Sequence, residues 1–184
     1  MTGELVLVGG GVRAGKSAYA IALAERLGER RVFVATAQAL DGEMEARIRA
    51  HRAERSDRFV TMEEPLELPG TLAGVDTDVV VVDCLTFWIS NLLLRGDDLD
   101  GVAAQVDRLA DVLARRRFHA ILVTNEVGMG VVPESALGRA FRDAAGRAHQ
   151  RLAREADQIY LAVLGCVVRL RPAPLTLVQP WTSP

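Results

Sequence analysis

The stretch from residue 5 to residue 17 constrains the fold more than any other part of the sequence. Its first four residues are apolar and predict a buried strand, a glycine-rich turn follows, and residues 18–27 have the spacing of a helix that ends at Gly28. The turn matches G-x-x-x-x-G-K-[ST], the spacing of a phosphate-binding P-loop. The residues that carry the match are Gly10, Gly15, Lys16 and Ser17.

The P-loop spacing has a direct chemical meaning. Glycines let the backbone N–H groups point inward at phosphate oxygens, and the start of the helix adds further donors and partial positive charge. Lys16 is expected to reach the β- and γ-phosphates, and the Ser17 hydroxyl to bind Mg²⁺. A glycine-rich turn can also join a strand to a helix for geometric reasons alone, but the flanking elements favour nucleotide binding. The expected contacts are Gly10, Gly11, Val12, Arg13, Ala14, Gly15, Lys16 and Ser17.

Strand and helix patterns alternate along the rest of the chain. The valines from Asp78 to Asp83 run without polar alternation, which is typical of a parallel strand covered on both faces. Residues 167–170 suggest an edge strand, and the proline-containing tail from Arg171 is not specified. We predict an α/β fold of the P-loop NTPase (RecA-like) type, with a mostly parallel sheet, helices on both faces and one domain over residues 1–184. The other expected strands are 31–35, 59–62, 120–124 and 159–164, and the other expected helices are 41–55, 87–94, 99–118 and 134–157.

Composition excludes several classes of protein. The 184 residues carry a net charge of −2, which does not favour nucleic acid as a partner. No apolar run reaches the length of a membrane span, and no signal peptide precedes the first strand. Cys84 and Cys166 show no metal-ligand spacing and are expected to be small buried residues. A cytoplasmic enzyme is the expectation.

Ligands of an open parallel sheet bind at the carboxyl ends of its strands. Asp83 ends the valine strand, where an acidic residue commonly helps to hold the Mg²⁺ of a P-loop protein. Its alternative role is to cap the next helix. The loop of residues 124–134, with polar residues and two glycines after a strand, is either a plain connection or a substrate loop. Arg139, Arg142 and Asp143 on the following helix are candidates to point back at the same cleft.

His51 is the second candidate centre of chemistry. It shares a face of the helix expected over residues 41–55 with Met44 and Ile48, and a histidine near a helix C-terminus is ordinarily stabilised by the helix dipole. Four arginines nearby, Arg47, Arg49, Arg52 and Arg55, repel one another unless an anion binds, and they favour the neutral imidazole. A neutral histidine among arginines can attack a phosphorus centre.

These motifs together resemble one family, the bifunctional adenosylcobinamide kinase/adenosylcobinamide-phosphate guanylyltransferases of cobalamin biosynthesis. The P-loop is generic, whereas the helix that contains His51 and the Asn-Glu-Val-Gly-Met-Gly loop are specific. The resemblance runs from residue 5 to about residue 165. Its blocks are residues 9–17, 35–37, 41–52, 83–86, 123–130 and 141–143.

The resemblance implies two reactions. The γ-phosphate of ATP or GTP passes to the aminopropanol hydroxyl of adenosylcobinamide; GTP then guanylylates His51, and GMP moves to adenosylcobinamide phosphate to give adenosylcobinamide-GDP. Lys16 is expected to be the second catalytic residue and Ser17 and Asp83 the Mg²⁺ ligands, as P-loop chemistry predicts, and the resemblance implies a homotrimer. The further nucleotide contacts implied by motif position are Val34, Ala35, Thr36, Arg52, Ala53, Glu54, Arg55, Glu63 and Asp83.

The chain departs from the family pattern at four positions. Ala14 replaces a frequent serine, Ala50 leaves His51 as a single histidine, His149 replaces an expected asparagine, and Asp83 replaces glutamate. Two alternatives stay open: a monofunctional P-loop small-molecule kinase, which needs no nucleophilic histidine, and a non-catalytic nucleotide-binding regulatory module.

Overall fold

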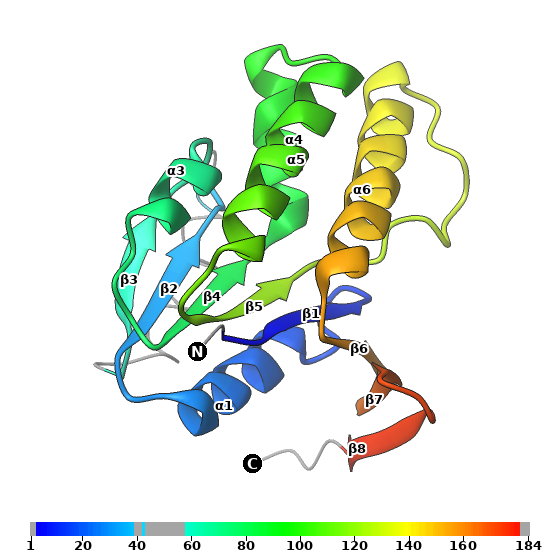
Figure 1. The fold of residues 1–184 in the computed structure, drawn as a ribbon. Coiled ribbons are helices and arrows are strands. Elements are labelled where there is room, and N and C mark those ends of the chain that lie inside the picture. Colours follow the sequence, from blue (N-terminus) through cyan, green and yellow to red (C-terminus); the bar gives the residue numbers. More distant parts are fainter. Residues whose placement is uncertain (1–2, 39–41, 43–57, 181–184) are drawn as a thin grey trace.

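The computed structural model describes residues 3–38, 42 and 58–180 (Figure 1). The described strands all belong to one sheet. They are β1 (Leu5–Gly10), β2 (Arg31–Ala35), β3 (Val60–Glu63), β4 (Val79–Asp83), β5 (His119–Val123), β6 (Gln158–Val163), β7 (Cys166–Arg171) and β8 (Thr176–Pro180). The order across the sheet is β3-β2-β4-β5-β1-β6-β7-β8. The pairings from β3 to β6 are parallel, and those of β7 with β6 and β8 are antiparallel.

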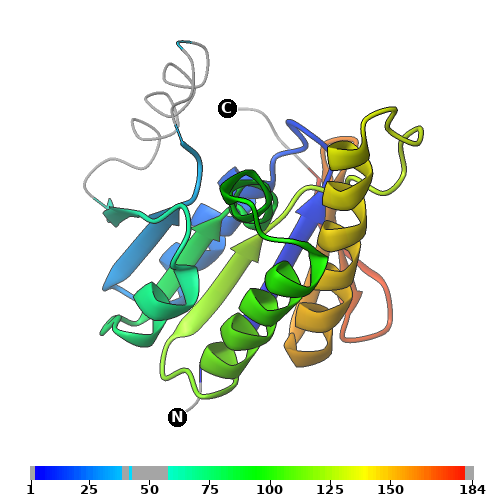
Figure 2. The same ribbon diagram turned by 90° about the horizontal axis from the view of Figure 1, so that it is seen from above.

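Helices cover both faces of the sheet. In the described residues they are α1 (Lys16–Leu27), α3 (Leu68–Ala73), α4 (Leu85–Arg95), α5 (Leu99–Ala114) and α6 (Ala136–Glu155). Helix α1 lies on one face, and the other four lie on the opposite face, as Figures 1 and 2 show. The mostly parallel, doubly covered sheet predicted from the sequence is confirmed.

The valine strand shows why both faces are covered. Val80 and Val82 of β4 pack in the core beneath α4, α5 and α6, whereas Val79 and Val81 pack in the core beneath α1. All four side chains are fully buried. Because successive strand residues point to opposite faces, an unbroken apolar run requires two covering layers.

Side-chain caps begin the two long helices of the larger layer. The carboxylate of Asp98 accepts a hydrogen bond from the Gly101 N–H (2.8 Å) at the start of α5. The hydroxyl of Ser135 accepts one from the Gly138 N–H (3.0 Å) at the start of α6. Each cap satisfies a donor that has no partner within the first helical turn.

The end of helix α5 and the place of strand β7 differ from the predictions. Helix α5 ends at Ala114 rather than at residue 118, because His119 already pairs in β5 and the chain must turn before it. Strand β7 is not an edge, since β8 forms in the tail that the sequence left unspecified and covers it. Apart from residue 42, the helix predicted over residues 41–55 lies outside the described residues. No described helix has both the length and the apolar character needed to cross a membrane.

Candidate nucleotide-binding site

The P-loop joins β1 to α1 and depends on two glycines. Gly10 has φ +148°, and a Cβ there would lie 2.2 Å from the carbonyl oxygen of Ala162 on the neighbouring strand. Gly15 has φ +90° and forms the N-cap of α1, which begins at Lys16, two residues earlier than predicted. A side chain at either position would strain the turn. Because both residues are glycines, no side chain separates the backbone of the loop from a phosphate bound there.

Lys16 and Ser17 stand on the first turn of α1. Lys16 is only 7% exposed, and its Nζ donates to the carbonyl of Gly11 (2.6 Å), so the ammonium group lies over the loop. Ser17 is half-buried next to it, while Val12 and Arg13 form the exposed tip of the loop. The first-turn N–H groups and the lysine thus place positive charge at one point, as a phosphate site requires.

Strand register brings predicted residues of three other strands into line with the P-loop. Glu63 of β3 lies opposite Ala35 of β2, which lies opposite Asp83 of β4. Asp83 in turn lies opposite Val123 of β5, the neighbour of Val8 in β1. Adjacent strands are about 4.8 Å apart, so the Asp83 backbone is about 10 Å from β1.

Asp83 points to the face of the sheet on which the P-loop helix lies. Val79 and Val81 pack against α1, and the alternation of side chains puts Asp83 on the same side. Its side chain is partly exposed. At this position a carboxylate can approach a ligand bound at the P-loop. The predicted alternative role, a helix cap, is not observed, because the N-cap residue of α4 is Cys84.

Two other predicted nucleotide contacts are buried. The Thr36 hydroxyl donates to the Cys84 carbonyl (2.7 Å) and accepts from the Cys84 N–H (2.8 Å), which ties the end of β2 to the end of β4. Val34 is fully buried under α4–α6, on the face opposite the P-loop helix. Neither residue presents an exposed side chain, so a contact with a nucleotide there would use the main chain.

A second polar pair, partly buried, lies at the end of β5. Nε2 of His149, on α6, is 2.6 Å from the Thr124 hydroxyl, and the Thr124 N–H donates to the Val8 carbonyl (2.9 Å). Burial lowers the pKa of His149, and the carboxylate of Glu126 opposes that shift. The histidine that departs from the family pattern therefore supports the strand end beside the P-loop.

The loop that follows β5 begins in contact with the P-loop. The Glu126 N–H donates to the Gly10 carbonyl (3.0 Å), and the Asn125 amide donates to the Thr86 hydroxyl (3.1 Å). Arg139 and Arg142 do not extend from α6 into the cleft as suggested by their spacing. Both guanidinium groups instead donate to main-chain carbonyls of residues 128–134.

Sequence reasoning missed the polar residues that join these strand ends. Asn91 of α4 is buried and donates to the carbonyls of Thr36 (2.8 Å) and Pro65 (3.1 Å). A buried amide within the apolar residues 87–94 was the available signal, because such a group needs hydrogen-bond partners. Cys84 is buried as predicted, and burial raises the pKa of its thiol to about 11.

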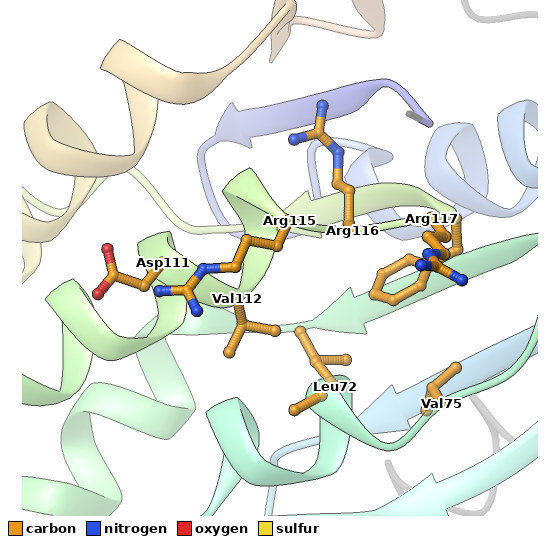
Figure 3. Close-up of a pocket in the computed structure, with 9 residues that line it drawn as sticks. Leu72, Val75, Asp111, Val112, Arg115, Arg116 and Arg117 are labelled. Atoms are coloured by element: carbon orange, nitrogen blue, oxygen red, sulfur yellow. The ribbon is translucent and has the colours of Figure 1, made fainter. Parts of the chain in front are cut away.

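One cavity lies away from all of these residues. It has a volume of about 490 Å³, sits between α3 and α5, and is lined by residues that precede β4 and β5, at the amino-terminal edge of the sheet (Figure 3). Leu72 and Val112 face one another across it, and Arg116 points away. It is therefore separate from the P-loop edge.

Several predicted site residues lie outside the described part of the chain. They are His51, Arg52, Ala53, Glu54 and Arg55. Within the described residues, no group of three or more His, Cys, Asp or Glu side chains is arranged to hold a metal ion. Ser17, on the first turn of α1, and Asp83, at the end of β4, each carry an oxygen of the kind that Mg²⁺ binds.

Comparisons with known proteins agree with this geometry. The RadB recombinase structure is similar to this chain with a TM-score of 0.54 at 18% identity, covering 96% of this chain and 86% of that one, which supports a P-loop NTPase fold of the RecA-like type. The bifunctional adenosylcobalamin biosynthesis protein CobP of Pseudomonas aeruginosa is 42% identical over 92% of this chain and 98% of its own length. The bifunctional adenosylcobalamin biosynthesis protein CobU of Escherichia coli is 39% identical over 91% of this chain and 99% of its own length.

The sequence pattern of one family, described as cobinamide kinase / cobinamide phosphate guanyltransferase, matches residues 6–170. That range includes the P-loop, the ends of β2, β4 and β5, and the loop held by α6. The chain therefore belongs to the cobinamide kinase / cobinamide phosphate guanyltransferase family.

Proposed function

We propose that this chain phosphorylates adenosylcobinamide with ATP or GTP and then transfers GMP from GTP to adenosylcobinamide phosphate. The observation that carries the proposal is a P-loop after β1 at the same ends of the strands as Asp83 of β4, one strand away across β5, within a sequence that matches the family over residues 6–170. We further propose that residues 1–184 form one nucleotide-binding domain, that three copies assemble, and that the enzyme acts in the cytoplasm.

In the first reaction, the aminopropanol hydroxyl attacks the γ-phosphorus, the bond to the bridging oxygen breaks, and ADP or GDP leaves. The Lys16 ammonium and the N–H groups at the start of α1 stabilise the charge that develops on the phosphate oxygens. Ser17 and Asp83 are the proposed ligands of Mg²⁺, which neutralises charge on the bound phosphates. Ala35, Glu63 and the exposed P-loop tip are proposed to contact the nucleotide.

In the second reaction, a nitrogen of His51 attacks the α-phosphorus of GTP and pyrophosphate leaves. A phosphate oxygen of adenosylcobinamide phosphate then attacks the guanylyl group, adenosylcobinamide-GDP forms, and His51 is regenerated. The support for His51 is its motif position and the arginines near it in sequence, which favour the neutral, nucleophilic imidazole. Arg52, Ala53, Glu54 and Arg55 are proposed nucleotide contacts on the same segment.

Two variants separate the reactions. Cobinamide is incubated with γ-labelled ATP in one assay, and the phosphorylated product with α-labelled GTP in the other. His51→Ala should keep phosphorylation within about threefold and lose guanylyl transfer by about 10³-fold, because it removes only the nucleophile. Lys16→Ala should lose both by about 10²-fold, because one cradle binds the nucleotide for both steps.

Circular dichroism spectra that match the wild type show that the variants are folded. Guanylyl transfer that survives in His51→Ala would contradict the role of this residue. A wild-type chain that phosphorylates cobinamide but never transfers GMP would instead support the monofunctional kinase, and one that does neither would support the regulatory module.

A further inference from the structure

The loop of residues 128–133, here the apolar loop, is held in place by α6. Arg142 donates to the carbonyls of Gly128 (2.7 Å) and Val131 (2.7 Å). Arg139 donates to the carbonyls of Pro133 (3.0 Å) and Glu134 (2.6 Å). Bonds from charged donors are stronger than neutral ones, so the two arginines fix the path of the backbone at four carbonyls.

The fixed backbone turns its apolar side chains to solvent. Met129 is 87% exposed, Val131 93% and Val132 68%, and Leu137 on the first turn of α6 is also exposed. Apolar side chains scattered singly over a surface are ordinary, but Met129, Val131 and Val132 lie within four residues of one another on a loop whose backbone is held by two arginines. Such a surface is typical of a binding site for an apolar ligand.

The apolar loop is continuous with the nucleotide site. It begins two residues after Glu126, whose N–H bonds to Gly10 of the P-loop, and the exposed Val12 stands at the tip of that P-loop. Figure 2 shows the P-loop and the apolar loop at the same edge of the sheet. A molecule that accepts phosphate from a bound nucleotide must approach this edge.

We propose that the apolar loop binds the corrin ring of cobinamide while its aminopropanol arm reaches the P-loop. This inference rests on the proposed function. A corrin ring carries methyl groups between its amide side chains, and these methyl groups present apolar areas that match the sulfur and methyl groups of Met129, Val131 and Val132. The guanidinium groups of Arg139 and Arg142 act as positioning groups that keep these side chains outward.

The test variant combines Met129→Ser with Val131→Ser. The KM for cobinamide in the phosphorylation reaction should rise about ten- to hundredfold, the effect of removing two apolar contacts. The KM for GTP and the rate at which GTP guanylylates the enzyme should stay within about twofold, because neither needs a corrinoid. A conservative double variant, Met129→Leu with Val131→Ile, should restore the KM for cobinamide.

The matched control combines Val60→Ser with Leu175→Ser, two exposed apolar residues at the amino-terminal edge of the sheet. It should leave the KM for cobinamide unchanged. An unchanged KM for cobinamide in the test variant overturns the inference. So does a KM for GTP that rises as much as the KM for cobinamide. A loss of assembly on gel filtration also overturns it, because the loop would then be a contact between subunits. Each of these results leaves the proposed function standing if guanylylation persists; a wild type that is never guanylylated contradicts the proposed function instead.

Discussion

His149 is a partly buried histidine whose burial affects its titration. Its Nε2 is 2.6 Å from the hydroxyl of Thr124, at the end of the strand beside the P-loop. Burial lowers the pKa of the imidazole below its ordinary value of 6.5. The neutral form is therefore the one that fits the folded chain, and protonation would place a charge in a poorly solvated position.

This burial predicts how stability responds to pH. The unfolded chain binds the His149 proton at a higher pH than the folded chain does, so folding loses free energy as pH falls from about 6.5 towards the lowered pKa. His149→Gln keeps an amide where Nε2 stood and does not titrate. The unfolding free energy of both proteins is measured by urea denaturation at about pH 7.5 and at about pH 5. Between these pH values the wild type should lose more unfolding free energy than the variant. The extra loss should be about 1.4 kcal/mol for each pKa unit by which the folded and unfolded pKa values of His149 differ.

The same comparison contains its own control, because both proteins share every other titrating group. A difference in unfolding free energy that stays constant with pH would contradict the account, and so would one that moves in favour of the wild type at low pH.

Among the elements, the short connection between α6 and β6 links several segments at the amino-terminal ends of the parallel strands. The carboxylate of Asp157 accepts from the Leu5 N–H (2.7 Å) and from the Arg116 guanidinium (2.7 Å), and Arg116 also donates to the Leu113 carbonyl (2.6 Å). The Arg116 side chain is 8% exposed, and burial lowers its pKa while Asp157 opposes that shift. One carboxylate thus connects β1, α6 and the turn between α5 and β5.

Removing that carboxylate should cost stability. Asp157→Ala leaves a mostly buried guanidinium and the Leu5 N–H without this acceptor, so we expect a loss of about 1–3 kcal/mol of unfolding free energy, reduced because Asp157 is itself half exposed. Urea denaturation measures the change. Asp111→Ala, at an exposed position of α5, is the matched control and should stay within about 0.5 kcal/mol. Equal losses in the two variants would contradict the proposed connection.

The elements also show how far sequence reasoning reaches. Strand β2 matches the prediction at both ends, and α1 ends at Leu27 as predicted, because apolar spacing and Gly28 are local signals. The bonds between Thr36 and Cys84, 48 residues apart, and between Thr124 and His149, 25 residues apart, depend on how strands are ordered in the sheet. The two α6 arginines were expected in the cleft, since their spacing gives their face of the helix but not the carbonyls that they meet.

On the scale of the whole molecule, the amino-terminal and carboxyl-terminal ends of the parallel strands carry different features. The amino-terminal edge is joined by the ion pair of Asp157 with Arg116, and the cavity between α3 and α5 opens there. The carboxyl edge gathers the P-loop, Asp83, the Thr124–His149 pair and the apolar loop. A parallel sheet produces this division because its strand ends converge on one side.

The central claim is that this carboxyl edge serves two transfers, one to cobinamide and one through His51. The most direct test incubates the protein with α-labelled GTP and maps the label by peptide mass spectrometry. The account predicts one GMP on the peptide that contains His51, labile to acid and stable to hydroxylamine, and no label in His51→Ala. Label on another residue, or no label on a folded chain that phosphorylates cobinamide, would contradict it.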